Sequence, residues 1–306
     1  KIQSTLVSAV GIDPHGPAAP QFHKANSSAW QPRFLSPAQI EQFLADGFLL
    51  IPRAFDPDLA RRWREDANRR IREEPQQWVR GYDPTDERKT LRDYSPNDPS
   101  TWTWPRLVLE GNVEMPVDEF APTAWAAICD LLGGPERIKT RSWSNYLNLN
   151  FNEHAELGFD RPRPDWVGWH IDDPHPAMRL DGIQNGLVCI TLFDAVLPAS
   201  GNTWLCPDSV ARVARELAEH PEGVDFVTDR GARITKQCTR FHEVVGETGD
   251  VFLLHPLLMH SSSPNRSGRI RWMGNPMVYM QRPLDPLRPR LDELSPVELA
   301  IRQAIS

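Results

Sequence analysis

The feature that most constrains the fold is a series of short apolar runs separated by turns in the second half of the chain. Such a series from Asp165 onward is typical of an antiparallel barrel or a jelly roll. In chain order, the expected strands are 167–171, 186–195, 201–206, a weak one at 233–239, 241–245, 250–254 and 270–280, preceded by runs at 138–142 and 145–151. The sequence therefore predicts a mainly β fold.

Helices are expected to flank these strands. Ser36-Pro37-Ala38-Gln39 has the pattern of a capping box with proline in the first turn, so a helix should begin there and end at Asp46-Gly47. Further helices are expected at about 57–71, 122–132 and 208–220, and after a second capping box at Ser295. A short buried strand is expected at 48–52. We expect an N-terminal arm at 1–33 and a single domain at 34–306, with its β core at about 138–280 and a Trp- and Pro-rich insert at 74–121 as a lid or substrate wall.

Composition excludes several classes of protein. The net charge of −7 argues against nucleic-acid binding, which needs a basic surface. No apolar run reaches the roughly 20 residues of a membrane helix, and the first residues lack the apolar core of a signal peptide. The four cysteines form no Cys-x-x-Cys pair, which disfavours a zinc ribbon. We expect a cytoplasmic monomer or homodimer that binds neither nucleic acid nor membrane.

A His-x-Asp pair, His170 and Asp172, is the first candidate for chemistry. Residues i and i+2 of a strand point to the same side, so both could bind one metal ion. With a distant third ligand, His260, they would complete the two-histidine, one-carboxylate triad that holds non-haem Fe(II). Taken alone, the pair is more simply a surface histidine beside an acidic turn. Asp173 is an alternative ligand, but as residue i+3 it should face away.

Two further histidines and two arginines bear on this hypothesis. His255 should make a structural hydrogen bond, and His175 could line a substrate entrance. Arg271 lies within an apolar run eleven residues after His260, where a buried guanidinium needs an anion. The far carboxylate of 2-oxoglutarate would suit its planar donors. Arg269 would share the same strand face, and a structural ion pair is the alternative role for Arg271.

These residues resemble the phytanoyl-CoA dioxygenase family of Fe(II)- and 2-oxoglutarate-dependent oxygenases. The resemblance runs from 35–40 and 46–48 through 168–172 and 201–207 to the block that holds His260 and Arg271. It implies a double-stranded β-helix (jelly-roll, cupin-like) core. It also implies Fe(II) bound by His170, Asp172 and His260. For 2-oxoglutarate it implies Arg271, with Ser262 and with Asn148 or Asn150. The segment 207–210 lacks the family's usual Gly-Ser-His ending, although no implied ligand lies there.

The resemblance implies an enzyme that uses Fe(II), 2-oxoglutarate and O₂ to oxidise a small organic molecule, with hydroxylation the leading reaction and succinate and CO₂ released. Related halogenases replace the carboxylate ligand with a small residue, so Asp172 points away from halogenation. A non-catalytic jelly-roll binding module and a keto-acid-independent cupin-type metalloenzyme are the alternatives. Trp102, Trp104 and Trp169 are the tryptophans best placed to line a pocket, and Arg161 or Arg163 could attract an anionic substrate.

Overall fold

In the computed structural model, the described residues are 30–86, 91, 93–172, 178–226 and 230–306. Most of the expected N-terminal arm, together with Asp173 and His175, lies outside them. No described helix is both long and apolar enough to cross a lipid bilayer.

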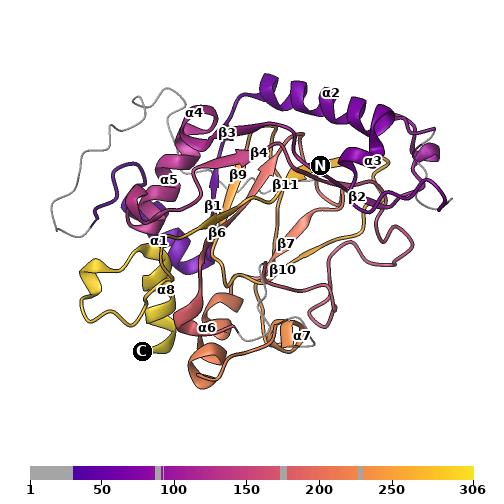
Figure 1. The fold of residues 1–306 in the computed structure, drawn as a ribbon. Coiled ribbons are helices and arrows are strands. Elements are labelled where there is room, and N and C mark those ends of the chain that lie inside the picture. The colour runs from indigo at the N-terminus through magenta and orange to yellow at the C-terminus, as the bar shows by residue number, and fades with distance from the viewer. Residues whose placement is uncertain (1–29, 87–90, 92, 173–177, 227–229) are drawn as a thin grey trace, which may run out of the picture.

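A large antiparallel sheet forms the centre of the fold (Figure 1). In spatial order it contains β1 (Phe48–Ile51), β9 (Val251–Leu254), β6 (Asn185–Leu192), β11 (Arg271–Gly274), β5 (Leu147–Asn150) and β2 (Arg106–Leu109), and β12 (Met277–Tyr279) also pairs with β6. Its strands come from both ends of the chain, so the sheet is assembled from residues far apart in sequence.

A second, smaller antiparallel sheet contains β10 (His260–Ser262), β7 (Thr203–Leu205) and β8 (His242–Glu243). Strands β3 (Glu114–Pro116) and β4 (Ser142–Ser144) form a separate two-stranded ribbon. The fold confirms the predicted jelly-roll core, mainly sheet with flanking helices. Among the described residues, the strand orders of these three sheets are open, and none of the sheets closes into a barrel.

Alternation of side chains along the strands separates two apolar cores. The core between the sheets consists of Phe48, Val188, Ile190, Leu192, Val196, Leu205, Val210, Val244, Phe252, Leu254, Leu258 and Met273. Intervening residues such as Leu49, Cys189 and Leu253 belong to the other core, which includes the helices. One face of the large sheet thus packs on helices, and the other encloses the jelly-roll interior.

The helices lie around this scaffold as the capping patterns predict. They are α1 (Pro37–Asp46), α2 (Pro57–Glu73), α3 (Pro75–Trp78), α4 (Val117–Phe120), α5 (Pro122–Leu132), α6 (Ser209–Glu219), α7 (Arg230–Thr235) and α8 (Pro296–Ile305), with single 3-10 turns at Pro99–Thr101, Pro135–Arg137, Leu180–Gly182 and Leu291–Glu293. Figure 1 shows α1, α5 and α8 grouped on one side of the large sheet, with α2 along its end. Both predicted capping boxes, at Ser36 and Ser295, are formed.

Four strand predictions were wrong. The run predicted at 138–142 contains only an isolated bridge, from Ile138 to Met280, and the first residue of β4. The segment predicted as a weak strand at 233–239 instead contains part of α7, where the Thr235 hydroxyl donates to the backbone carbonyls of Pro164 and Gly231. The expected strand at 167–171 is only one isolated bridge, between His170 and His260. The run at 270–280 is divided into β11 and β12 by Asn275-Pro276, because proline has no N–H for sheet pairing.

The 74–121 insert has regular structure that its sequence did not reveal. Strand β2 lies within it and pairs with β5 as the edge of the large sheet. Of its tryptophans, Trp102 is buried against Phe151 and donates its indole N–H to the Ser95 carbonyl. The part of the insert near β2 is therefore built into the scaffold, whereas a role as lid or substrate wall stays a prediction.

Candidate metal centre

His170, Asp172 and His260 meet at one point, although the second and third are 88 positions apart in sequence. Their potential ligand atoms all lie within 4.8 Å of one another. Asp172 Oδ1 lies 3.6 Å from His170 Nε2, and Asp172 Oδ2 lies 3.6 Å from His260 Nε2. Two imidazoles and one carboxylate thus converge with the composition of a facial triad.

Backbone pairing brings the two histidines together. The His170 N–H donates to the His260 carbonyl at 3.0 Å, and the His260 N–H donates back to the His170 carbonyl at 2.9 Å. Their ring centroids are 4.4 Å apart. The expected geometry therefore arises from a bridge to β10, while Asp172 lies in a bend beyond that bridge.

A backbone carbonyl at Nδ1 fixes the ring orientation of each of the two histidines. His170 Nδ1 lies 2.7 Å from the Gly168 carbonyl oxygen, and His260 Nδ1 lies 3.0 Å from that of Leu258. A carbonyl can only accept, so each Nδ1 carries the proton and each Nε2 offers a lone pair. Metal-binding histidines usually have such a partner on the second nitrogen.

Burial and mutual interaction shift the pKa of each member of the triad. Although one side of its ring is exposed, desolvation by the surrounding protein, and then the proximity of His260, lower the pKa of His170 to about 4. Burial opposes ionisation of Asp172, but His260 and His170 outweigh it and hold its pKa well below the usual range. Burial would lower the pKa of His260, yet Asp172 raises it. At neutral pH the carboxylate is ionised and His170 is neutral, as metal binding requires.

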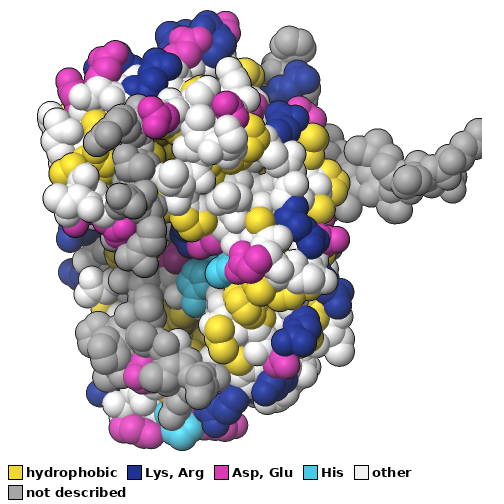
Figure 2. All heavy atoms as spheres, turned by 90° about the vertical axis from the view of Figure 1, so that its right-hand side faces the viewer, with side chains coloured by type: hydrophobic (Ala, Val, Ile, Leu, Met, Phe, Trp, Pro, Cys, Tyr) yellow, Lys and Arg dark blue, Asp and Glu magenta, His cyan; other side chains and the backbone are white. Residues whose placement is uncertain are grey.

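The triad opens to solvent on one side. The His170 side chain is 49% exposed, whereas that of His260 is 9% exposed. Figure 2 shows histidine side chains at a hollow in one face of the molecule. A ligand could therefore reach the triad from the side of His170.

Arg271 lies in the jelly-roll interior on β11. It is 4% exposed, and its Nη1 donates to the Gly201 carbonyl, just before β7, so the side chain reaches from one sheet toward the other. Its Nε has no partner among the described residues. Burial, and then repulsion by Arg106, lower the pKa of Arg271 to about 9, which still leaves it charged at neutral pH. Arg269, by contrast, has a side chain 55% exposed and lies 4.0 Å from Asp194.

The other candidates for cofactor binding are near the site but differ in contacts. Asn148 is buried on β5 opposite Met273 of β11, and Asn150 lies opposite Arg271. Asn148 donates to the side-chain oxygen of Asn275, which in turn contacts Asp172. Ser262 is half-buried at the end of β10 and, two residues from His260, shares its side of the strand.

Two residues of the site were missed from the sequence. Asn275 was read as part of a continuous strand, although its offset of four from Arg271 would have placed both on one face. Arg106 belongs to the insert and lies opposite Asn150 across β2 and β5, on the far side from Arg271. Its influence on Arg271 depends on a strand pairing that no local pattern indicated.

Other predicted residues pack elsewhere. His255 makes the expected structural hydrogen bond, from Nε2 to the Val297 carbonyl. Trp169 is buried against Phe241, and its indole N–H donates to the Arg163 carbonyl. Arg161 stacks over the Phe241 ring, at 5.3 Å from its centroid.

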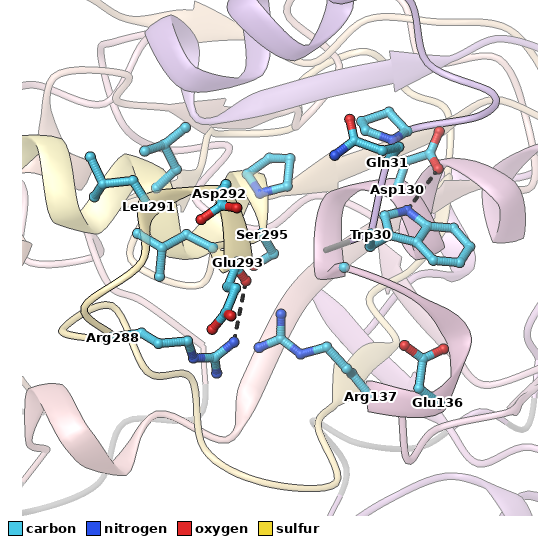
Figure 3. A pocket seen from close by; sticks show the side chains of 15 residues that line it. Trp30, Gln31, Asp130, Glu136, Arg137, Arg288, Leu291, Asp292, Glu293 and Ser295 are labelled. Carbon is cyan, nitrogen blue, oxygen red and sulfur yellow. Dashed lines mark hydrogen bonds between the residues drawn. The ribbon is translucent and has the colours of Figure 1, made fainter. Parts of the chain in front are cut away.

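A separate pocket of about 420 Å³ lies between the first described residues, the end of α5 and the segment before α8. Figure 3 shows Arg137 and Arg288 pointing toward one another there. Arg137 forms a two-pronged ion pair with buried Glu298, and Arg288 lies 3.6 Å from the same carboxylate. Both arginines already have a carboxylate partner, so we interpret the pocket as a structural contact region that is distinct from the triad.

Comparison with known proteins gives a family match. The phytanoyl-CoA dioxygenase (PhyH) family profile matches residues 43–273, which include the triad and Arg271. No curated protein matches the chain.

Several solved structures are distantly similar. HygX from Streptomyces hygroscopicus, with nickel and 2-oxoglutarate bound, is 15% identical, covers 78% of this chain and 85% of its own, and has a TM-score of 0.42. EvdO2 from Micromonospora carbonacea var. aurantiaca, complexed with 2-oxoglutarate, is 14% identical, covers 86% and 98%, and has a TM-score of 0.44. The carbocyclase SnoK from nogalamycin biosynthesis is 13% identical, covers 82% and 85%, and has a TM-score of 0.44.

Proposed function

Because the chain belongs to the phytanoyl-CoA dioxygenase family, we propose that it is an Fe(II)- and 2-oxoglutarate-dependent dioxygenase that hydroxylates a small organic molecule. O₂ is the second co-substrate, and succinate and CO₂ are released. The observation that supports this most directly is the convergence of His170, Asp172 and His260 at a point open to solvent, together with the burial of Arg271.

The donor set suits Fe(II). Two neutral imidazoles and a carboxylate bind this ion while leaving coordination positions for other ligands. The carbonyls of Gly168 and Leu258 orient the two rings, so the Nε2 lone pairs are directed before the metal arrives. His170, Asp172 and His260 are the proposed iron ligands.

Arg271 suits the distal carboxylate of 2-oxoglutarate. A buried guanidinium whose Nε has no partner in the described part of the chain is costly unless an anion completes its hydrogen bonds. A carboxylate would supply both the charge and the acceptors. Ser262 and Asn148 are proposed as further contacts to the co-substrate.

The protein residues divide the work of the reaction. Bound iron would supply the oxidative chemistry with O₂ and the keto acid. Arg271 holds one end of the keto acid, the two histidines and Asp172 fix the metal, and the apolar core between the sheets excludes water from the interior. Retention of Asp172 as a ligand favours hydroxylation over halide transfer. The half-exposed side of His170 is where substrate would approach.

The test is an anaerobic titration of purified protein with Fe(II) and then 2-oxoglutarate, followed by the visible charge-transfer absorption of the ternary complex. His170→Ala should abolish metal retention. Arg271→Gln should leave Fe(II) binding intact but raise the Kd for 2-oxoglutarate roughly 10- to 100-fold, because a charge-assisted hydrogen bond contributes about 1.5–3 kcal/mol. Arg269→Gln is the matched control and should bind 2-oxoglutarate as wild type does.

The outcomes separate the proposal from its rivals. Metal and 2-oxoglutarate binding without succinate release on addition of O₂, across a panel of small-molecule candidates, would favour a non-catalytic binding module. Oxidation that needs iron but no keto acid, and that survives Arg271→Gln, would favour a keto-acid-independent metalloenzyme. The cytoplasmic location and the monomeric or homodimeric state stay predictions.

A further inference from the structure

Asn275 connects the large sheet to the carboxylate of the proposed metal centre. It follows directly after β11, and its Nδ2 donates to Asp172 Oδ2 at 3.3 Å. Its Oδ1 accepts from Asn148 Nδ2 at 2.5 Å, and Tyr146 Oη lies 3.5 Å from Asn148 Oδ1. The side chains of Tyr146, Asn148 and Asn275 thus form a linear hydrogen-bond network that ends at Asp172.

Every hydrogen bond in this network has the same donor-to-acceptor direction, toward Asp172. The Tyr146 hydroxyl donates to the Asn148 carbonyl, the Asn148 amide donates to the Asn275 carbonyl, and the Asn275 amide donates to the carboxylate. Turning the Asn275 amide over would bring its oxygen against Asp172 and its N–H₂ against that of Asn148. The ionised carboxylate and Asn148 therefore select the same orientation of Asn275.

Pairing of β11 with β5 positions the residues of this hydrogen-bond network. Met273 lies opposite Asn148 in the antiparallel pair of β11 and β5, so continuing this register brings Asn275 beside Tyr146. Gly274, between them, leaves no room for a side chain: a Cβ there would lie 2.7 Å from the Thr191 hydroxyl. Asp172, in contrast, lies in a bend and outside any strand. A donor fixed to the sheet thus faces a carboxylate whose own backbone is not held by a strand.

We propose that Asn275, oriented by Asn148 and Tyr146, is a positioning residue that sets the rotation of the Asp172 carboxylate for metal binding. The inference rests on the proposed metal centre and deepens it. Asn275 donates to Oδ2 of Asp172, while Oδ1 of Asp172 lies on the side of the exposed His170. A neutral amide can restrain a carboxylate in this way without adding charge beside the metal. Asn148 then acts on Asp172 through Asn275, in addition to any contact with the co-substrate.

The decisive measurement is anaerobic titration with Co(II), a spectroscopic substitute for Fe(II), without 2-oxoglutarate. Asn275→Leu removes the donor at similar volume and should raise the Co(II) Kd roughly 10- to 100-fold, the usual cost of losing a partner of a metal ligand. Asn275→Asp places a second negative charge near Asp172 and should change the ligand-field spectrum as well as the affinity. Asn112→Leu is the matched control, because Asn112 Nδ2 donates to Asp66 Oδ2 at 3.2 Å outside the site. It should leave the Co(II) Kd unchanged.

A double-mutant cycle tests whether the hydrogen-bond network acts as a unit. Asn148→Leu alone should weaken Co(II) binding, but it should add little in the Asn275→Leu background, because Asn148 acts through Asn275. Thermal unfolding of the metal-free variants reports whether each one folds. A less stable Asn275→Leu protein with the Co(II) Kd of wild type would overturn the proposal and leave Asn275 a structural role. Wild-type protein that binds no Co(II) would instead overturn the proposed metal centre.

Discussion

Two histidines five residues apart, His255 and His260, show how single contacts determine the role of a side chain. Both are buried, and both have one ring nitrogen hydrogen-bonded to the backbone. The other nitrogen of His255 accepts from the Leu257 N–H at 3.1 Å, whereas that of His260 faces Asp172. His255 is thereby held neutral, and His260 keeps a lone pair directed at the candidate metal position.

The buried state of His255 predicts a pH dependence of stability. Burial lowers its pKa in the native protein to about 4, whereas an unfolded histidine titrates near 6.5. The unfolded chain therefore binds more protons between these values. The contribution is complete above about pH 6.5 and is lost as the pH falls toward 4, by about 3 kcal/mol in all. Urea unfolding of metal-free wild type and His255→Gln across this range measures it.

The effect of His255 is the difference in unfolding free energy between wild type and His255→Gln, because His170 and the carboxylates titrate in both proteins. The free energy of unfolding should fall more steeply with decreasing pH in wild type than in His255→Gln. Parallel curves for the two proteins would show that His255 is protonated equally in the native and unfolded states.

At the level of elements, helix starts followed from sequence better than strand limits did. Ser36 and Gln39 form the predicted capping box, with the Ser36 N–H donating to Gln39 Oε1 at 2.9 Å. Such a cap depends only on residues within one turn. The weak strand predicted at 233–239 failed because the helix there depends on distant groups: Gly231 packs so closely against the Trp169 carbonyl that a Cβ would lie 2.4 Å from it.

The Ser36 cap predicts a local effect on stability. Ser36→Ala removes the acceptor for the Gln39 N–H, and loss of an N-cap side chain typically costs about 1 kcal/mol. Chemical denaturation should show this loss, while the Co(II) Kd stays that of wild type. Ser306→Ala, at the exposed C-terminus, is the control and should change stability by less than about 0.5 kcal/mol. Equal effects of the two substitutions would contradict a capping contribution.

At the level of the whole molecule, Glu298 connects the C-terminal helix to the rest of the fold. This fully buried carboxylate pairs with Arg137 through both oxygens and accepts the backbone N–H groups of Asp285 and Ser295. Figure 3 shows Arg137 and Arg288 directed into the adjacent pocket. One side chain thus joins α8, the turn at 135–137 and the loop before α8.

Removing this charge should destabilise the whole domain. Glu298→Gln leaves Arg137 without its ionic partner, and breaking a buried ion pair from one side costs about 3–5 kcal/mol. Thermal and urea unfolding should show one transition shifted to lower stability. Glu293→Gln, which alters a carboxylate whose side chain is 38% exposed, is the control and should have little effect. A wild-type midpoint for Glu298→Gln would mean that the pair makes no net contribution.

Sequence alone determined the residues of the candidate site and the class of fold. The spacing of His170 and Asp172, the isolated His260 and the arginine in an apolar run are local features, and they supported the triad and Arg271 once the family resemblance was added. Short apolar runs separated by turns are also local features, and they predicted the mainly β fold. The pairing of His170 with Asp172 and the pattern of short strands needed only neighbours along the chain, whereas adding His260 and Arg271 needed the family resemblance.

Tertiary structure decided what depends on pairing between distant segments. The bridge of His170 to His260, the burial of Arg271 but not Arg269, and the contact of Asn275 with Asp172 all require the sheets to be assembled. A strand fixes which side its residues face, but not which strand lies beside it or where a loop such as 171–172 ends. The physical reason is that these contacts join residues far apart in sequence: Phe48 of β1 lies opposite Leu254 of β9, and the hydrogen bond from Asn275 to Asp172 joins residues 103 positions apart. No local sequence pattern encodes such separations.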